Sequence, residues 1–565
     1  MTLDLTARDT TSVATYVKSG QPWVWMTAAA ISVAFIITVA LLMLTAVRGL
    51  PHFWPAALVQ GEYREPGKDA TPILVELLDS EEISTARLLS AGQKVDSAVP
   101  FHARVLAKVG NRDVYGADFR YLLDEWIANR SKPADATVLE RTEWGNFQGR
   151  IVSVKQDGQI IASGAQSFAV WQPLQARANK LREELHAIEK KEIGRINYAL
   201  ERVRLDGKRL TLAGQTEASN PAAFKALTGR KASLDADYET LRTRLAKLKT
   251  EIARDALVMK TVDGQEQEVA LSKIVRGYQP NNMELTAKVV LYFQKLGEFV
   301  FDEPREANTE GGIFPAIFGT VMMVLLMSVF VTPFGILAAL YLREYARQGL
   351  VTQIIRIAVN NLAGVPSIVY GMFGLGFFVY FLGGNIDRLF YAESLPSPTF
   401  GTPGILWSSL TLAILTLPVV IVATEEGLAR IPRSLREASL ALGATKVETL
   451  WKVVLPMASP AMMTGLILAI ARAAGEVAPL MLVGVVKLAP SLPLDGNFPF
   501  VHLERKFMHL GFHIYDVGFQ SPNVEAARPL VYATSFLLVL VIVLLNVSAI
   551  RIRNSLREKY KALDG

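Results

Sequence analysis

The stretch REASLALG at residues 436–443 is followed, after a gap of nine residues, by VVLP at residues 453–456. It lies between two long apolar segments and is itself too polar to sit in hydrocarbon. The small residues, the glycine in the middle and the proline at the end predict a short helix, a turn and a second short helix. A polar helical hairpin held at a membrane surface is suited to dock a soluble partner. The stretch therefore predicts a mainly α, polytopic membrane protein that works with a partner outside the bilayer.

Six apolar segments support this interpretation. The chain has 565 residues, of which 51% are hydrophobic, and each segment supplies roughly the 20 residues needed to cross about 30 Å of hydrocarbon. The first segment has too long an apolar core for a signal peptide, and no small-residue cleavage site follows it, so we expect a retained anchor. The expected spans are residues 26–47, 316–342, 362–382, 405–424, 464–486 and 530–550.

The basic residues predict the orientation of these spans. The net charge of +6 could suggest nucleic acid, but Lys and Arg gather in the short loops after the second, fourth and sixth segments, which is typical of cytoplasmic loops. We therefore expect no nucleic-acid partner, a lipid membrane around the chain, and both termini in the cytoplasm. The expected organisation is a cytoplasmic tail at 1–25, a first helix at 26–47, an extracytoplasmic domain at 48–312, a membrane core at 313–550 with a cytoplasmic loop at 425–460, and a tail at 551–565.

The extracytoplasmic segment 48–312 reads as a large α+β domain. Residues 73–78, 102–109 and 150–154 have the β-branched content of strands, and apolar residues recur at helical spacing in 181–203 and 234–252, which predicts an antiparallel helical hairpin. The hairpin could pack on its own domain or serve as an arm that docks an external partner. No metal cluster, catalytic triad or glycine-rich phosphate loop is apparent there. The absence of Cys from the chain also excludes a disulfide scaffold, a Cys-ligated metal and a Cys nucleophile, and we expect no cofactor.

The fifth span contains two charged residues, Arg472 and Glu476. Their spacing of four places them on one helical face, about two turns from the loop end of the expected span. An Arg in a membrane helix costs about 2.5–3.5 kcal/mol on insertion scales, which makes it a functional candidate. The pair could simply neutralise itself, or the planar guanidinium could bind an oxyanion while Glu476 orients it. Gly475 and Pro479 weaken the helix locally, so that backbone groups could line a cavity.

The third span begins with small residues around Pro366. These residues permit close helix packing, and the proline removes one backbone hydrogen bond. Packing explains the pattern, and lining of a pathway is the alternative.

The loop motif resembles the coupling loop of bacterial ABC importer permeases, whose pattern is E-A-A, three residues, G, nine residues and I-x-L-P. Ser439 replaces the second Ala and Val453 replaces the Ile. The strings LAGVPSIVYGMFGL at 362–375 and ARAAGEVAPL at 471–480 look like the PstA-type subunit of phosphate importers, over about residues 301–561. By this resemblance the ATPase-coupling residues are Glu437, Ala438, Ser439, Gly443, Leu455 and Pro456.

The resemblance implies the type I ABC importer permease fold with six transmembrane helices, in the bacterial inner membrane. It further implies inorganic phosphate as substrate, a heterodimer with a PstC-type permease, a cytoplasmic PstB-type ATPase dimer and a periplasmic phosphate-binding protein. Arg472 is then a residue of the phosphate path. Relatives often carry a second Arg shortly before the Thr-Glu-Glu that ends the fourth span, but Val422 stands at that position here, which bears on anion selectivity.

The chain has no motor of its own, because no G-x-x-x-x-G-K-[ST] loop occurs in it. We therefore expect a permease subunit that is not an enzyme, with ATP hydrolysis supplied by a partner. Two alternatives are a permease for another oxyanion, such as molybdate or sulfate, and a membrane-anchored extracytoplasmic sensor. The coupling motif argues against the sensor, which would more naturally carry a cytoplasmic signalling helix or enzyme domain.

Overall fold

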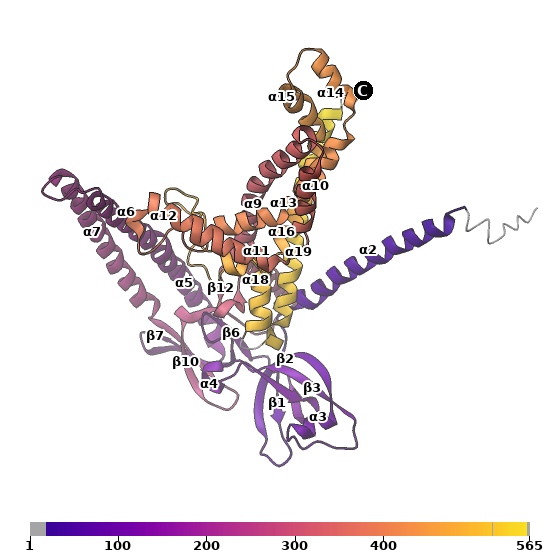
Figure 1. Ribbon diagram of the computed structural model, residues 1–565. Helices are drawn as coiled ribbons and strands as arrows, with labels where there is room; N and C mark the ends of the chain where they lie inside the picture. Colours follow the sequence, from indigo (N-terminus) through magenta and orange to yellow (C-terminus); the bar gives the residue numbers. More distant parts are fainter. Residues whose placement is uncertain (1–18, 522–523, 562–565) are drawn as a thin grey trace, which may run out of the picture.

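The computed structural model describes residues 19–521 and 524–561, so most of the expected tail at 1–25 and the last four residues of the expected tail at 551–565 lie outside the described part. Within it, six helices are long and apolar enough to span a membrane, the number that the sequence predicts. The mainly helical membrane architecture, with a large α+β domain between its first two spans, is confirmed (Figure 1). The spans are Gln21–Phe53, Phe314–Tyr345, Ser367–Phe390, Ile405–Arg430, Lys446–Gly475 and Val524–Ser555.

Three helices form the centre of the membrane core: α9 (Phe314–Leu340), α13 (Ile405–Arg430) and α16 (Leu455–Gly475). α13 is the most buried of the spans. Small residues let its neighbours approach, because a Cβ added at Gly465 would lie 2.7 Å from the Cβ of Ala423. The apolar core among these helices includes Met323, Met327, Leu412, Val420, Ala469 and Ala473.

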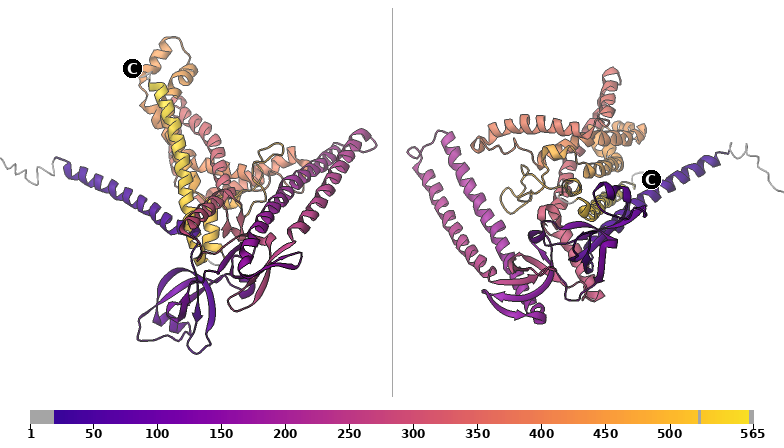
Figure 2. Two further views of the ribbon diagram at one scale, coloured as in Figure 1. Left: turned by 180° about the vertical axis from the view of Figure 1, so that it is seen from behind. Right: turned by 90° about the horizontal axis from the view of Figure 1, so that it is seen from below.

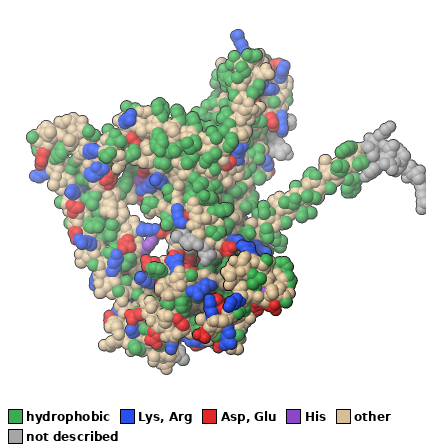
Figure 3. All heavy atoms as spheres, turned by 60° about the horizontal axis from the view of Figure 1, so that its bottom comes forward, with side chains coloured by type: hydrophobic (Ala, Val, Ile, Leu, Met, Phe, Trp, Pro, Cys, Tyr) green, Lys and Arg blue, Asp and Glu red, His purple; other side chains and the backbone are tan. Residues whose placement is uncertain are grey.

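The first and last spans lie at the side of this core. α2 (Gln21–Gly49) meets α19 (Val524–Lys561) only near its carboxyl end, where Gly49 packs against the backbone of Ala533. The rest of α2 projects away from the molecule with its apolar side chains exposed (Figures 1 and 3). Such a helix suits a hydrocarbon environment and not water.

Two spans differ from the sequence expectation. The fifth was expected at 464–486, but the helix begins with α15 (Lys446–Thr449), passes through one π-helical turn into α16 and ends at Gly475. Apolar residues continue beyond it, but they form the short α17 (Leu480–Val483) and a loop buried in the protein.

The third span was expected to start at 362. Instead α10 (Leu350–Leu362) ends there, and a new helix starts after Pro366 with α11 (Ser367–Phe373) and continues through π-helical turns into α12 (Gly384–Phe390). Pro366 lacks the N–H that would continue the first helix, and it disfavours helical backbone at the residue before it.

The domain between the first two spans, called the external domain because it lies outside the membrane core, contains two antiparallel sheets. They lie at the end of the molecule opposite α14 (Arg433–Ala441) and α15 (Figure 1). The first has the order β4-β3-β2-β1-β5 and the second the order β10-β9-β7-β6-β11, with β8 paired to β7. The expected strands at 73–78 and 150–154 fall within β2 and β7, and the one expected at 102–109 corresponds to β3, which ends one residue earlier. The strands are β1 (Leu58–Tyr63), β2 (Thr71–Ser84), β3 (Phe101–Lys108), β4 (Phe119–Leu123), β5 (Ile127–Ser131), β6 (Thr137–Arg141), β7 (Phe147–Gln156), β8 (Gln159–Ser163), β9 (Asp255–Lys260), β10 (Glu266–Ala270) and β11 (Ile274–Tyr278).

The expected helical hairpin is present between β8 and β9. α5 (Ser167–Ala187) continues through a π-helical turn into α6 (Ile193–Leu212), and α7 (Pro221–Ile252) returns antiparallel to it. The root of the hairpin packs on the second sheet through Trp171, Ala178 and Ile252. Its far end leaves the domain and lies beside α12 of the membrane core (Figures 1 and 2).

The chain returns from the external domain to the membrane through α8 (Leu285–Phe301). One face of α8 packs on the membrane core, with the rings of Phe299 and Phe53 4.9 Å apart. A two-stranded ladder, β12 (Pro304–Arg305) with β13 (Glu310–Gly311), then leads into α9. Charged side chains gather over this external part and hydrophobic ones cover the membrane helices (Figure 3).

Candidate coupling loop and membrane pathway

The motif at residues 436–456 forms the expected helix–turn–helix. α14 (Arg433–Ala441) and α15 lie at the tip of the membrane core farthest from the external domain (Figure 1). The start of α15 is fixed by a capping box, in which the Thr445 hydroxyl accepts from the Glu448 N–H and the Glu448 carboxylate accepts from the Thr445 N–H. The Ser439 and Thr449 hydroxyls, 2.9 Å apart, join the two helices.

Gly443 makes the turn between them. Its φ is +87°, the left-handed region that L residues rarely adopt. A Cβ added there would meet no atom within 4 Å. Within this chain, glycine is therefore needed at this position for its backbone conformation and not for lack of room.

Arg436 holds the loop against the membrane core. Its guanidinium donates to the carbonyls of Ile431 (2.7 Å) and Leu428 (2.8 Å) and to the carboxylate of Glu344 (2.9 Å). Lys446 donates to the Glu344 carbonyl at 2.6 Å. Glu344 lies 92 residues before Arg436, so these contacts could not be predicted from the local sequence.

The coupling residues fall into two groups by exposure. Glu437, Ala438 and Gly443 face solvent, whereas Leu455 is buried beneath the loop and Ser439 and Pro456 are half-buried. The loop also exposes a patch of large apolar side chains, of which Leu442 is 89% exposed. An exposed apolar patch on a polar loop is typical of a protein contact. Its members are Leu435, Leu440, Leu442, Val447 and Trp451.

Arg472 lies in the last turn of α16, not near the loop end of its span. Leu455 precedes it by 17 residues, a rise of about 26 Å along the helix. Glu476 does not share a helical face with it, because the helix ends at Gly475 and Glu476 has extended backbone (φ −79°, ψ 131°). The structure nevertheless brings the two side chains together, with Arg472 Nε 3.6 Å from Glu476 Oε1.

This pair is loose. The distance exceeds that of a hydrogen bond, and among the described residues no hydrogen bond from the Arg472 guanidinium is formed. The two side chains are 34% and 21% exposed. The donors of Arg472 are therefore available to an anion, and a cation at the carboxyl end of a helix is also favoured by the helix dipole.

The break in the third span lies beside this pair. Tyr370, near the start of α11, is buried, donates to the Leu362 carbonyl across the break, and lies within the electrostatic influence of Arg472. Gly371 brings α11 against the segment after Glu476, since an added Cβ would lie 2.7 Å from the Cα of Pro479. The small residue at this position therefore permits close packing between the third span and the segment that follows Glu476. Val422 is 37% exposed.

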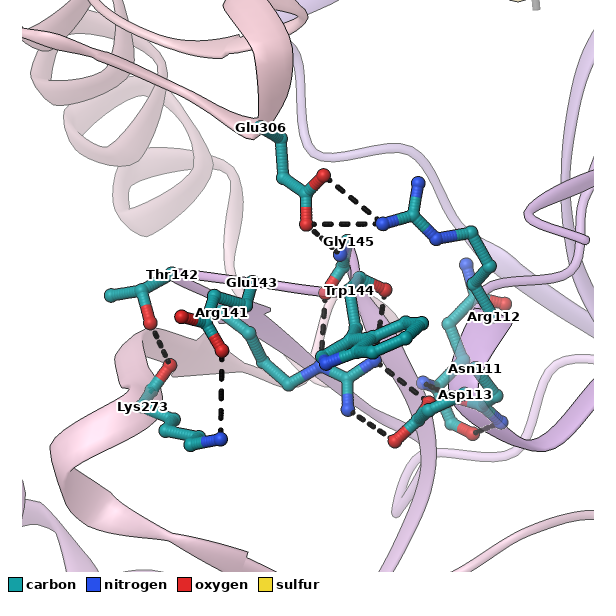
Figure 4. Close-up of polar contacts among 11 residues, drawn as sticks. Asn111, Arg112, Asp113, Arg141, Thr142, Glu143, Trp144, Gly145, Lys273 and Glu306 are labelled. Carbon is teal, nitrogen blue, oxygen red and sulfur yellow. Dashed lines mark hydrogen bonds and ion pairs between the residues drawn. The ribbon is translucent and has the colours of Figure 1, made fainter. Parts of the chain in front are cut away.

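A polar joint connects the external domain to the segment before α9 (Figure 4). Glu306 accepts from Arg112 (3.1 Å) and from the Gly145 N–H (3.3 Å), while Arg141 pairs with both oxygens of Asp113. Two residues further, Asn308 donates to the Lys487 carbonyl and to the Asp516 carboxylate of the membrane core. The external domain is therefore attached to the membrane core by side-chain contacts as well as by the covalent backbone.

Comparison with known proteins places the membrane core in a family. A family model described as "Binding-protein-dependent transport system inner membrane component" matches residues 331–561. The probable ABC transporter permease protein YqgH of Bacillus subtilis is 33% identical over 193 residues, which cover 34% of this chain and 59% of that protein. The phosphate transport system permease protein PstA 1 of Mycobacterium tuberculosis is 33% identical over 247 residues, which cover 43% of this chain and 71% of that protein.

Among solved structures, a chain of the MetNI methionine ABC transporter in an inward-facing conformation aligns with a TM-score of 0.31 and 19% identity, over 43% of this chain and 94% of that chain. The region of the family match contains both the loop at 433–456 and Arg472, and it leaves out the external domain.

Proposed function

We infer the function from one premise: this chain belongs to the binding-protein-dependent transport system inner membrane components and is an ABC transporter permease of the PstA type. We propose that it is the permease subunit of an ATP-driven phosphate importer in the bacterial inner membrane, with both termini in the cytoplasm. It forms the translocation path with a PstC-type permease, receives phosphate from a periplasmic phosphate-binding protein and couples to a PstB-type ATPase dimer.

The observation that carries the substrate assignment is the loosely held guanidinium of Arg472 in a membrane helix. Phosphate at neutral pH is an anion with several acceptor oxygens, and a planar fork of donors matches it. Glu476, 3.6 Å away, orients the guanidinium and keeps the anion from binding too tightly to be released.

The coupling follows from the continuity of one helix. From Lys446 to Gly475 the fifth span is one continuous helical segment that includes the π-helical turn Leu450–Val454. Its first turns belong to the loop and its last turn carries Arg472. A displacement of the loop by the ATPase would therefore move Arg472 directly. The apolar patch of the loop supplies the contact, and Arg436 ties the loop to the second span through Glu344.

Uptake of radiolabelled phosphate tests the proposal, in cells with and without this gene and with sulfate and molybdate as competitors. We expect gene-dependent phosphate uptake that neither competitor suppresses. Suppression by molybdate or sulfate would instead assign another oxyanion. Failure of any ATPase to copurify would favour the sensor.

Four variants test the role of the pair at matched membrane levels. Arg472→Gln should nearly abolish uptake while assembly with the ATPase persists, and Arg472→Lys should retain part of it because the charge remains without the planar fork. Glu476→Gln should also impair uptake. If the pair serves only to neutralise itself, the Arg472→Gln/Glu476→Gln double variant would regain near-normal transport, and Arg472 would be removed from the phosphate path.

A further inference from the structure

The far end of the helical hairpin contacts two separate loops of the membrane core. Arg209 of α6 pairs with Glu393, and Lys208 donates to the Leu395 carbonyl. One side of the contact is therefore the segment that directly follows α12, at the end of the third span. Glu393 is enclosed there, with a side chain 7% exposed.

Tyr198 of α6 reaches the second loop. Its hydroxyl donates to the Phe498 carbonyl at 2.5 Å, and its ring meets the edge of His502 with 5.8 Å between centroids. His502 is itself fixed between Asp495 (3.0 Å) and Glu504 (3.1 Å). This second loop joins α17 to α18 (Leu510–Tyr515). Since α17 begins four residues after Glu476, this second loop continues the same stretch of chain that carries Arg472 and Glu476.

The root and the far end of the hairpin are held very differently. The root is part of a hydrophobic core, with Trp171 almost fully buried. The far end contacts the membrane core through the polar and edge contacts just described, and the Arg209 side chain is 60% exposed, so solvent screens the pair. Between them, the π-helical turn Ile188–Glu192 interrupts the helix, and such turns often mark functional sites. The hairpin has a firm base, an irregular turn above it and a weakly held end.

Glu393 carries its charge in this contact. Burial alone would raise the pKa of its carboxyl, but the hydrogen bond and charge of Arg209 hold that pKa below its usual value. The pair with Arg209 is therefore an ion pair at neutral pH.

We propose that α6 is a latch across the extracytoplasmic side of the permease. Bound as in this structure, it holds the loop at 391–395 and the loop at 498–502 in fixed relation to each other. It releases when these loops separate to admit the anion. The latch rests on the proposed function, in that it gives the external domain the role of controlling the outer mouth of the pathway. It differs from both roles that the sequence suggested, because the hairpin end neither packs on its own domain nor stands free for an external partner.

Cross-linking tests the latch in the full chain, which has no native Cys to interfere. The pair Arg209→Cys/Glu393→Cys, joined by a short thiol cross-linker that a reducing agent cleaves, should take up phosphate before cross-linking. Uptake should fall to background once the pair is joined, and reduction should restore it. The matched control joins α6 to α7 within the hairpin through Gly207→Cys/Leu227→Cys, where an added Cβ at 207 lies 3.8 Å from the Leu227 side chain. It should leave uptake unchanged.

Full-rate uptake by the joined 209/393 pair would overturn the latch. A second measurement needs no knowledge of the substrate. Spin labels at 209 and 393 in the copurified complex should be close without nucleotide and farther apart with a non-hydrolysable ATP analogue, and an unchanged distance would refute release. If the uncross-linked protein takes up no phosphate at all, the proposed function fails, and the spin-label distances still decide on the latch.

Discussion

Replacement of Gly443 separates two reasons why the coupling loop needs glycine. The residue has φ +87° and open space around its Cα. An L side chain there therefore costs backbone strain of about 1–2 kcal/mol and makes no clash within the chain. A cost of that size shifts a conformational equilibrium by a factor of about 5–30. Gly443→Ala should accordingly leave a reduced but measurable rate of uptake.

Gly443→Asp distinguishes strain from docking. Asp tolerates the left-handed region better than Ala does, so strain alone predicts that Asp is the milder change. If Gly443 and Glu437 seat in a groove of the ATPase, the larger charged side chain clashes with the partner. We expect Gly443→Asp to reach the membrane normally and to abolish uptake and copurification of the ATPase.

The matched control is Gly214→Asp in the hairpin turn, where φ is +75° and an added Cβ also meets no atom within 4 Å. It imposes the same strain away from the proposed interface and should transport normally. Uptake by Gly443→Asp equal to or above that of Gly443→Ala, at matched membrane levels, would refute the docking assignment.

Two further substitutions test the contacts that hold the coupling loop and those that stabilise the external domain. Arg436→Ala removes the hydrogen bonds that hold the loop and leaves the Glu344 carboxylate without the Arg436 guanidinium. The yield of copurified ATPase should therefore fall while the amount of permease in the membrane is unchanged. An unchanged yield would show that the loop keeps its position without Arg436. The second substitution concerns Glu140 in the external domain. Burial alone would raise the pKa of the Glu140 carboxyl, but the neighbouring cations, Lys295 first, lower that pKa from 4.5 to about 2. The contribution of Glu140 to stability is therefore complete above pH 4.5 and is lost as the pH falls toward 2. Glu140→Gln should lower the free energy of unfolding by about 3–5 kcal/mol, because Lys295 then loses its carboxylate partner in a largely buried site. The control Glu268→Gln, in an exposed pair, should change the free energy of unfolding by no more than about 1 kcal/mol. Equal thermal unfolding of the two variants would contradict this prediction.

The loop and three of the strands could be predicted because their signals are local. The turn at Gly443 and the cap at Thr445 are encoded within a few residues. The end of the fifth span could not be predicted, since a mainly apolar stretch continues past Gly475 and Glu476. Those residues are apolar because they are buried in protein, as when Val485 pairs with Phe507, and a hydropathy pattern cannot distinguish that from lipid.

Long-range polar contacts could not be predicted from the sequence either. Glu344 and Arg436, or Arg209 and Glu393, are ordinary surface charges in the sequence and acquire meaning only when the fold brings them together. Arg472 could be named from its cost in a membrane helix alone, but the turn in which it lies depends on where the helix ends.

The corrected end of the fifth span changes how the parts act together. With Arg472 in the last turn of α16, the loop and the anion-binding candidate occupy opposite ends of one rod. Beyond Glu476 the chain passes through α17 into the loop that Tyr198 contacts. A single stretch of chain thus connects the coupling loop, the charged pair and the loop at 498–502 that the latch contacts, in that order. Along this stretch, a displacement that starts at the coupling loop passes Arg472 before it reaches the latch contact. Disruption of the helix between Leu455 and Arg472 should uncouple the latch distance from nucleotide, while the loop still binds the ATPase.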